Sequence, residues 1–338
     1  MIEPPRIRFD HLLEMSDELG TFEHALLGEP RREQGYCTDD MARVAVVATR
    51  EPNPSPEVER LIETSLRFLG KAQSPDGGYR NRMSELGKWQ DLPTLEDCWG
   101  RSVWALGTAS SLIEADSTRQ MVLSQFEAAA RRRSPWRRAM SFASIGAAEL
   151  LAAWPGHVEA RALLIAAADA MPTCAKDPCW PWPEERLTYA NAVIPEAMIA
   201  AGSILDRGPL LRHGLDLLGW LLEHETFDGH LSVTPAGGSA PGEVRPAFDQ
   251  QPIEVAALAE ACARAAAIDA SDRRWTDGVR KSVDWFLGHN DGNHVMCDPD
   301  TGGGFDGLEA GGTNLNQGTE STLAFLSTLQ LGHRLVLR

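Results

Sequence analysis

The chain has 338 residues and carries 32 Lys and Arg against 48 Asp and Glu, which gives a formal net charge of -16. A surface of this charge repels nucleic-acid phosphates and anionic membranes, so we expect neither as a partner. No apolar run reaches the roughly 18 residues of a transmembrane helix, and residues 1–6 lack the basic and apolar regions of a secretion signal, so the sequence predicts a cytoplasmic protein.

Helical segments follow one another along the chain in six pairs, each an amphipathic segment and then one rich in small residues. The amphipathic segments show apolar residues at helical spacing with charges between them. They are expected at about 9–18, 61–69, 119–132, 158–171, 210–222 and 275–289, and their partners at about 39–50, 96–113, 139–153, 189–204, 250–268 and 318–331. Helices rich in Ala and Gly suit positions packed on several sides. The sequence therefore predicts an all-α fold, an (α/α)6 toroid of six helical hairpins, with residues 1–338 as a single domain.

The connections between these helices differ in length. Those that run from an amphipathic helix to the next small-residue helix are long, at 19–38, 73–95, 172–188, 225–249 and 290–317, whereas the reverse connections are short. Because the inner helices of such a ring run in one direction, all five long loops should meet at one rim. Long loops in a compact domain are usually functional, so we expect the chemistry at this rim.

Carboxylates cluster where the small-residue helices begin. Asp40 and Arg43, and likewise Asp97 and Arg101, are spaced to form ion pairs on one helix face. Helix capping explains one acid per helix, but two adjacent acids followed by an inward arginine exceed what capping requires. Glycoside hydrolysis needs two carboxyl groups. The catalytic candidates are Asp39, Asp40, Glu96, Asp97, Asp249 and Glu320. Asp97 and Glu320 are the preferred acid/base pair.

Aromatic, amide and basic residues occupy the same segments. Aromatic rings stack on the C–H faces of sugars, and amides bond to hydroxyl groups. The candidates for substrate binding are His24, Tyr36, Arg43, Tyr79, Arg101, Trp182, Tyr189, Asn191, Gln250, Gln251, Glu254, Asn316 and Gln317. The basic run at 131–138 fits a solvated helix end better than an anion site, since cations suit a helix C-terminus.

Neither metal nor nucleotide cofactor is expected. No set of His and Cys has usable ligand spacing, and no glycine-rich phosphate loop precedes a helix. Six scattered cysteines fit free thiols, and a bond between Cys174 and Cys179 would need a sharp turn. Few histidines fall in the rim loops, so His-based epimerase chemistry is weakly supported.

Six ordered blocks of the chain resemble a known family. They are FEHA at 22–25, GYCTDDMAR at 35–43, EDCWGRSVWALG at 96–107, LTYANA at 187–192, DQQPIE at 249–254 and NQGTEST at 316–322. They resemble bacterial (α/α)6-toroid proteins found beside, or fused to, glycosyltransferases and mannoside phosphorylases. The resemblance implies a carbohydrate-active toroid with a functional link to such an enzyme. Ala190 departs from it, because an acid is expected in a Thr-Tyr-Asp-Asn string.

The leading hypothesis is a glycoside hydrolase that acts on a short mannose- or glucose-containing oligosaccharide by carboxylate acid/base catalysis. A sugar epimerase or a phosphorylase on the same toroid remains an alternative, because fold does not fix reaction. A non-catalytic glycan-binding module is another. A terpenoid-cyclase-like enzyme is suggested by the string Gln73-x-x-Asp76-Gly77-Gly78.

Overall fold

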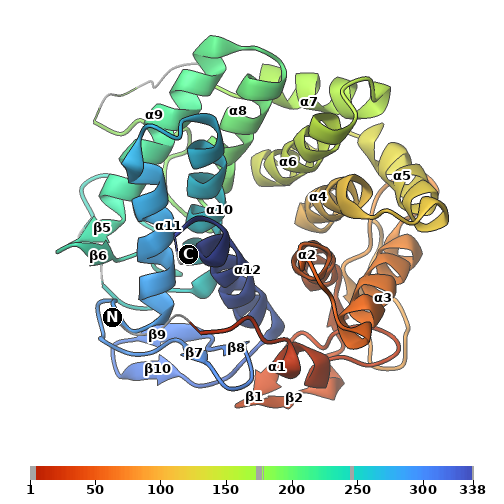
Figure 1. Cartoon of the computed structure of the whole chain (residues 1–338), viewed down its shortest axis with the longest axis horizontal. Coiled ribbons are helices and arrows are strands. Elements are labelled where there is room, and N and C mark those ends of the chain that lie inside the picture. Colours follow the sequence, from red (N-terminus) through yellow and green to blue (C-terminus); the bar gives the residue numbers. More distant parts are fainter. Residues whose placement is uncertain (1–4, 173–176, 178, 244–246, 337–338) are drawn as a thin grey trace.

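The computed structural model describes residues 5–172, 177, 179–243 and 247–336, and these form a ring of paired α-helices (Figure 1). The inner helices are α2 (Thr38–Thr49), α4 (Asp97–Leu112), α6 (Arg137–Ala153), α8 (Val193–Ile204), α10 (Pro252–Ile268) and α12 (Thr319–Leu335). The outer helices are α1 (Asp10–Glu14), α3 (Pro56–Ala72), α5 (Asp116–Ala130), α7 (Val158–Ala170), α9 (Gly208–His224) and α11 (Arg273–Phe286). The predicted (α/α)6 toroid is confirmed.

Two helices are shorter than the sequence predicts. The first outer helix has five residues, because the chain turns after Met15 and the Asp17 carboxylate accepts the N–H groups of Leu19 and Gly20. The fourth inner helix begins at Val193 rather than near 189. Ala190 is the cause, since its φ of 43° is left-handed and cannot belong to an α-helix.

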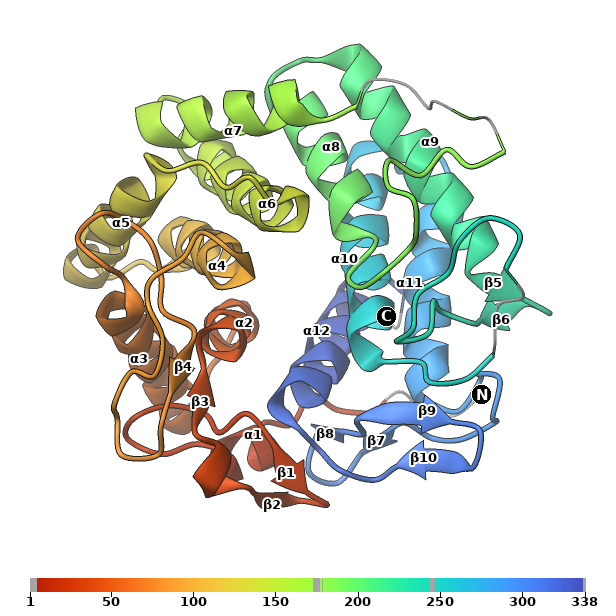
Figure 2. The ribbon, with the colours of Figure 1, turned by 180° about the vertical axis from the view of Figure 1, so that it is seen from behind.

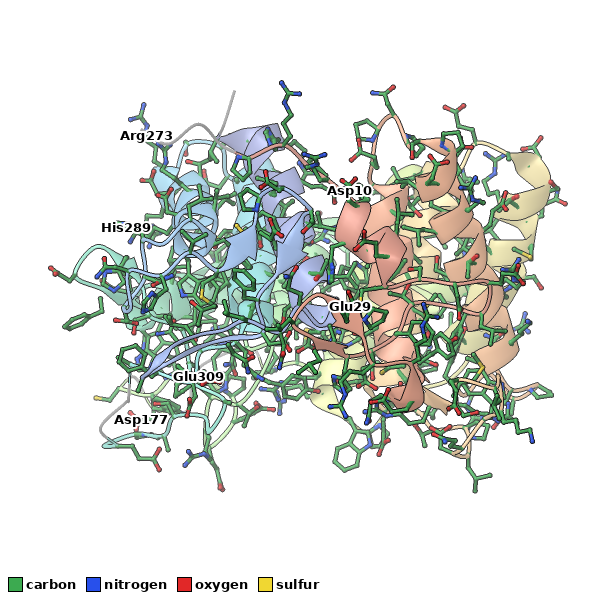
Figure 3. The ribbon with its side chains drawn as sticks, turned by 90° about the horizontal axis from the view of Figure 1, so that it is seen from below. Asp10, Glu29, Asp177, Arg273, His289 and Glu309 are labelled. Atoms are coloured by element: carbon green, nitrogen blue, oxygen red, sulfur yellow. The ribbon has the colours of Figure 1, made fainter. Side chains whose placement is uncertain are left out.

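Short antiparallel strands occur only in the long connections of the described chain. The pairs are β1 (Ala25–Leu26) with β2 (Glu29–Pro30), β3 (Tyr36–Cys37) with β4 (Arg82–Met83), β5 (Thr226–Phe227) with β6 (His230–Leu231), β7 (Cys297–Asp298) with β8 (Gly303–Gly304), and β9 (Gly307–Glu309) with β10 (Gly312–Asn314). Figure 2 shows the ring from the side on which these loops lie. In Figure 3, Asp177 and Glu309, from two long connections, lie at one end of the ring, and Arg273, at the start of α11, lies at the other.

Buried charges pack in the interior of the ring, toward the C-terminal end of α2. Arg50 lies 2.5 Å from Glu260 and 3.3 Å from Glu149. Arg264 lies 3.1 Å from Glu149 and 2.9 Å from Glu196. Four inner helices are thereby joined around the axis by ion pairs that satisfy one another, which is the condition under which buried charges are tolerated.

The five described cysteines, Cys37, Cys98, Cys179, Cys262 and Cys297, are free thiols, while Cys174 lies outside the described residues. None of the described helices is long and apolar enough to cross a membrane.

The left-handed backbone conformation of Ala190 leads to a prediction about stability. A residue with a Cβ is disfavoured there by about 1–2 kcal/mol, whereas glycine is not. We expect Ala190→Gly to raise the free energy of unfolding by about 0.5–1 kcal/mol in urea denaturation, after the larger entropy of the unfolded glycine chain is subtracted. The control is Ala192→Gly, where φ is -65° and glycine should lower stability. Similar losses in both variants would contradict strain at Ala190.

Candidate functional site

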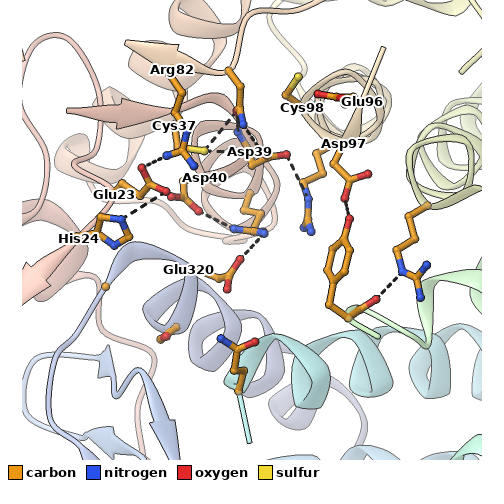
Figure 4. Close-up of a pocket in the computed structure, with 18 of the residues that line it drawn as sticks. Glu23, His24, Cys37, Asp39, Asp40, Arg82, Glu96, Asp97, Cys98 and Glu320 are labelled. Atoms are coloured by element: carbon orange, nitrogen blue, oxygen red, sulfur yellow. Dashed lines mark hydrogen bonds and ion pairs between the residues drawn. The ribbon is translucent and has the colours of Figure 1, made fainter. Parts of the chain in front are cut away.

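A cavity of about 850 Å³ opens at the rim that carries the long loops (Figure 4). Its walls combine these loops with the first turns of α2, α4, α6 and α12. The predicted catalytic candidates that line it are Asp39, Asp40, Glu96, Asp97 and Glu320. The predicted binding residues that line it are His24, Arg43, Arg101, Tyr189 and Gln251. Segments up to almost 300 residues apart in the chain, such as His24 and Glu320, are therefore brought to one space.

Arg43 joins the first and last inner helices at the cavity wall. One of its terminal nitrogens, Nη1, donates to Asp40 Oδ1 at 2.6 Å, and the other, Nη2, donates to Glu320 Oε2 at 2.7 Å. The Asp40 side chain is only 3% exposed, and this burial raises its pKa to about 7 although Arg43 acts in the opposite direction. The predicted Asp40–Arg43 pair is present, and Asp40 serves mainly to hold Arg43.

Glu320 is the more accessible partner of Arg43. Its side chain is 43% exposed, and it faces the open space across which Asp97 lies (Figure 4). Desolvation acts to raise the pKa of Glu320, but the positive charges of Arg43 and Arg101 outweigh it, so the pKa lies below its ordinary value. Glu320 is therefore an ionised carboxylate at neutral pH.

Asp39 shows the opposite behaviour. Desolvation is the largest influence on this carboxyl and raises its pKa, despite the nearby charges of Arg101 and Arg43. Its Oδ2 accepts a hydrogen bond from Asn81 Nδ2 at 2.9 Å. Its Oδ1 lies 3.4 Å from Arg101 Nε, but neither atom has a hydrogen-bond partner among the described residues. Desolvation therefore shifts Asp39 toward its protonated form, against the charge of its ion-pair partner Arg101.

Asp97 pairs with Tyr189 and not with Arg101, so the predicted ion pair within α4 is wrong. The Tyr189 hydroxyl donates to Asp97 Oδ2. Desolvation, and then the negative charge of Asp97, raise the pKa of this tyrosine. Arg138 supports the ring from the other side, since its Nε donates to the Tyr189 carbonyl at 2.6 Å and its guanidinium carbon lies 5.1 Å from the ring centroid. The Tyr189 hydroxyl therefore occupies one oxygen of Asp97.

Glu254 and Asn191 lie behind the cavity wall, contrary to the prediction that they bind substrate. Glu254 accepts the backbone N–H of Ala190, and its Oε2 accepts the backbone N–H of Asn191 at 3.2 Å and its Nδ2 at 3.0 Å. Desolvation and the neighbouring Glu225 raise the pKa of Glu254 to about 8. These bonds fix the backbone next to Tyr189 and so set the reach of that side chain into the cavity.

The two other tyrosines predicted at the site are core residues. Tyr36 is fully buried, its ring centroid is 4.7 Å from that of Phe22, and its hydroxyl donates to Asp17 at 2.8 Å. Tyr79 is also fully buried, and its hydroxyl accepts a bond from Gln73 Nε2 at 3.0 Å. Gln73 thereby serves the packing of its own loop. None of the residues of the string at 73–78 is in the described lining of the cavity. The main argument for a terpenoid-cyclase-like site is therefore removed.

The remaining predicted residues also lie away from the cavity. Trp182 is buried and stacks on Trp220, with ring centroids 6.1 Å apart. Gln250 is buried, and its Oε1 accepts the Trp285 indole N–H at 2.9 Å. Asp249, Asn316 and Gln317 belong to loops outside the described cavity lining. Asn316, for example, accepts the N–H of Leu27 at 2.9 Å and so shapes a neighbouring loop.

Several polar residues of the cavity are missing from the sequence prediction. They are Glu23, Asn81, Arg82, Arg137, Arg138, Glu184, Asp306, Asn314 and Ser321, together with the exposed Trp136. Glu23 stands beside His24 in a block that the family resemblance includes, so a signal was present. The prediction that the run 131–138 is a solvated helix end is wrong for its last two arginines, because they stand at the beginning of α6 rather than at the end of α5.

One group at the cavity has ligand atoms close enough for a metal ion. Single atoms of Glu23, Cys37 and Asp40 lie within 4.8 Å of one another. Burial raises the pKa of the Cys37 thiol well above its ordinary value, which opposes the thiolate that a metal requires. Arg82 donates to Glu23, and Arg43 donates to Asp40. The group is thus occupied by internal partners.

No family model and no curated protein sequence matches the chain. Solved structures share its fold. A sugar epimerase from a ruminal bacterium has a TM-score of 0.70 at 12% identity, over 96% of this chain and 95% of that one. Cellobiose 2-epimerase from Bacillus thermoamylovorans B4167 has a TM-score of 0.70 at 11% identity, over 95% of each chain. The cellulase Cel9M of C. cellulolyticum has a TM-score of 0.57 at 9% identity, over 94% of this chain and 88% of that one. At such identities the likeness shows the fold alone.

Proposed function

We propose that the chain is a glycoside hydrolase that cleaves a short oligosaccharide, with mannose or glucose units, in the rim cavity. The observation that carries the proposal is the opposite behaviour of two carboxyl groups in one cavity. The pKa of Glu320 is lowered, mainly by Arg43 acting against desolvation, whereas desolvation raises the pKa of Asp39. Two acids whose environments push their pKa values apart are suited to act as base and acid.

In this proposal Glu320 acts on water or on the anomeric carbon, and Asp39 donates a proton to the leaving oxygen. The sequence favours Asp97 as the partner of Glu320. We place Asp39 in that role because desolvation raises its pKa, whereas one oxygen of Asp97 is already occupied by the Tyr189 hydroxyl. Arg43 keeps Glu320 oriented and ionised through its 2.7 Å bond.

The walls of the cavity also suit a hydroxyl-rich ligand. Tyr189 is 41% exposed and Trp136 is 58% exposed, so both rings are accessible for stacking on a sugar face. Asn81, Gln251 and Asn314 carry amides that can bond to hydroxyl groups. The cavity is large enough for a short saccharide, since its volume of about 850 Å³ falls within the usual range of ligand sites.

Epimerisation of a reducing sugar is the second candidate, because enzymes of that kind share the fold. Such a reaction removes a proton from a carbon next to a carbonyl and requires a base suited to neutral pH. His24 is the single imidazole in the described lining, and its side chain is half-exposed, with Nε2 3.6 Å from Glu23 Oε1. One histidine at the edge of the cavity supports this reaction less well than the carboxyl pair supports hydrolysis.

The two candidates differ in their products. We expect purified protein, incubated with mannose- and glucose-containing oligosaccharides, to release shorter reducing sugars at the same rate with and without phosphate. Product analysis by NMR separates this result from the alternatives. Conversion of a reducing end to its epimer without cleavage would favour epimerisation, and release of a sugar phosphate would favour phosphorolysis. Binding of the sugars without any product would contradict all three reactions.

A further inference from the structure

Arg101 is a buried cation that makes no hydrogen bond to any of the described residues. The residue is 3% exposed, yet it lines the cavity. Its charged partner among the described residues is Asp39, whose Oδ1 lies 3.4 Å from Arg101 Nε, and its guanidinium carbon lies 4.1 Å from the Phe142 ring centroid. The Nε hydrogen has no hydrogen-bond acceptor within the part of the chain that the structure describes. A buried charged donor in this state is costly unless something else satisfies it, which points to a ligand.

The beginning of α6 adds a second positive element next to Arg101. Each other inner helix has an acid in its first turn, whereas α6 has none and starts with Arg137 and Arg138. Its N-cap, Trp136, makes no side-chain capping bond. Cations are unfavourable at the positive end of a helix dipole, so negative charge close by stabilises this arrangement.

The negative charge that the protein itself supplies there is limited. Glu184 pairs with Arg138 at 2.9 Å, and the same carboxylate lies 3.8 Å from Arg137 Nε, which is too far for a hydrogen bond. Arg137 therefore keeps unused donors. The N–H groups of the first helical turn also have no intrahelical acceptor.

Arg101 and the start of α6 border the same part of the cavity. The first turns of α4 and α6 are in backbone contact, because a Cβ added to Gly100 would lie 2.3 Å from the Ala139 carbonyl oxygen. Arg101 follows Gly100, and its guanidinium group packs over Phe142 of α6. The cavity thus has three arginines, Arg101, Arg137 and Arg138, where α4 and α6 meet, with Glu96 and Asp97 at the start of α4 beside them.

We propose that an oxyanion, either a carboxylate or a phosphate group, binds between Arg101 and the first turn of α6. The planar fork of a guanidinium matches the two oxygens of such a group, and the helix N-terminus favours negative charge. This inference rests on the proposed function, because it assumes that the substrate binds in the rim cavity. It adds that the substrate, or a co-substrate, carries a uronate carboxylate or a phosphate group.

The acids of the cavity do not prevent such binding. Arg43 bonds to both Asp40 and Glu320, Arg82 donates to Glu23, and the Tyr189 hydroxyl donates to Asp97, so each of these acids already has a donor. Asp39 is the acid nearest to Arg101, and desolvation favours its neutral form. The overall charge of -16 slows the approach of an anion but acts over the whole surface, and salt screens it.

The test measures binding rather than turnover, with glucuronate and inorganic phosphate as separate probes and glucose as the neutral control. Ionic strength is held constant with sodium chloride. We expect one or both anions to raise the melting temperature and to bind in calorimetry, and Arg101→Gln to weaken that binding by at least about tenfold, as the loss of a charge-assisted hydrogen bond requires. Arg132→Gln is the matched control, because Arg132 belongs to the same basic run but lies outside the cavity lining and contacts Asp76 at 3.4 Å.

Arg137→Gln covers the case in which Arg101→Gln does not fold, since Arg137 is partly exposed and its loss should weaken anion binding without unfolding the protein. Binding of glucuronate alone identifies an acidic sugar, and binding of phosphate alone identifies a phosphorylated sugar or free phosphate. The inference is overturned if glucose binds as tightly as both anions. It is also overturned if anion binding is unchanged in Arg137→Gln and in a folded Arg101→Gln variant. Anion binding without cleavage of any neutral glycoside would leave it standing while the proposed hydrolysis fails.

Discussion

Glu320→Gln is expected to lower the turnover of a cleavable glycoside by about 10²–10⁴-fold, the usual contribution of a general acid or base. Gln has nearly the same shape but cannot become the ionised group that acts on water or on the anomeric carbon. The fold should survive, because Arg43 keeps its bond to Asp40 after the change. Melting temperature and turnover measured on the same preparation separate these effects.

Asp39→Asn should cause a loss of similar size, and Asp97→Asn decides between two assignments. If Asp39 is the proton donor, Asp97→Asn retains most of the turnover that Asp39→Asn loses. The reverse result would restore the Asp97–Glu320 pair that the sequence favours. Glu96→Gln is the control, since Glu96 lines the cavity but is exposed and should tolerate the change. Near-normal turnover in both Glu320→Gln and Asp39→Asn would sink the carboxyl mechanism.

The pH profile gives an independent reading of the same pair. Activity requires Glu320 ionised and Asp39 protonated, so kcat/KM should be bell-shaped. It falls as pH decreases through the lowered pKa of Glu320 and as pH increases through the raised pKa of Asp39. The residual activity of Glu320→Gln should lack the acid limb, and that of Asp39→Asn should lack the alkaline limb. A purely structural role for either acid would leave both limbs in place.

Helix order and loop asymmetry were predictable because both depend on local patterns. Charges between regularly spaced apolar residues mark an outer helix such as α9, and runs of Ala mark an inner helix such as α10. Long connections on one side only then follow from chain direction. The boundary errors have local physical causes as well: the start of α8 moved because Ala190 is held in a left-handed conformation that its sequence does not suggest.

The direction of side chains within the rim loops was not predictable. Tyr36 and Tyr79 belong to the rim segments, but their rings point down into the core and their hydroxyls bond to Asp17 and Gln73. Sequence position places a residue near the cavity but cannot say which way a loop residue faces. Asp97 and Arg101 illustrate the same limit on a helix, where correct spacing did not produce a pair because Tyr189 supplied a closer partner to Asp97.

Close contact between α4 and α6 explains why both helices carry glycine where they meet. A Cβ added to Gly107 would lie 2.2 Å from the Gly146 carbonyl oxygen, and one added to Gly146 would lie 2.4 Å from the Val103 carbonyl oxygen. These acceptors are helix backbone and cannot rotate away as a side chain does. The two helices would have to move apart, which would disturb the adjacent walls that position Arg101 and Arg138.

Gly107→Ala is therefore expected to lower the free energy of unfolding by about 1–3 kcal/mol, although alanine is the better helix former by about 1 kcal/mol. Gly219→Ala is the matched control, because Gly219 lies inside α9 and its added Cβ would meet the end of the flexible Arg274 side chain at 3.2 Å and Trp275 at an ordinary contact distance of 3.8 Å. That variant should gain about 0.5–1 kcal/mol. Urea denaturation of both variants shows whether the free energy of unfolding falls in Gly107→Ala and rises in Gly219→Ala. A gain in both would mean that α4 and α6 can separate at little cost, and the close packing would then not be what fixes the cavity walls.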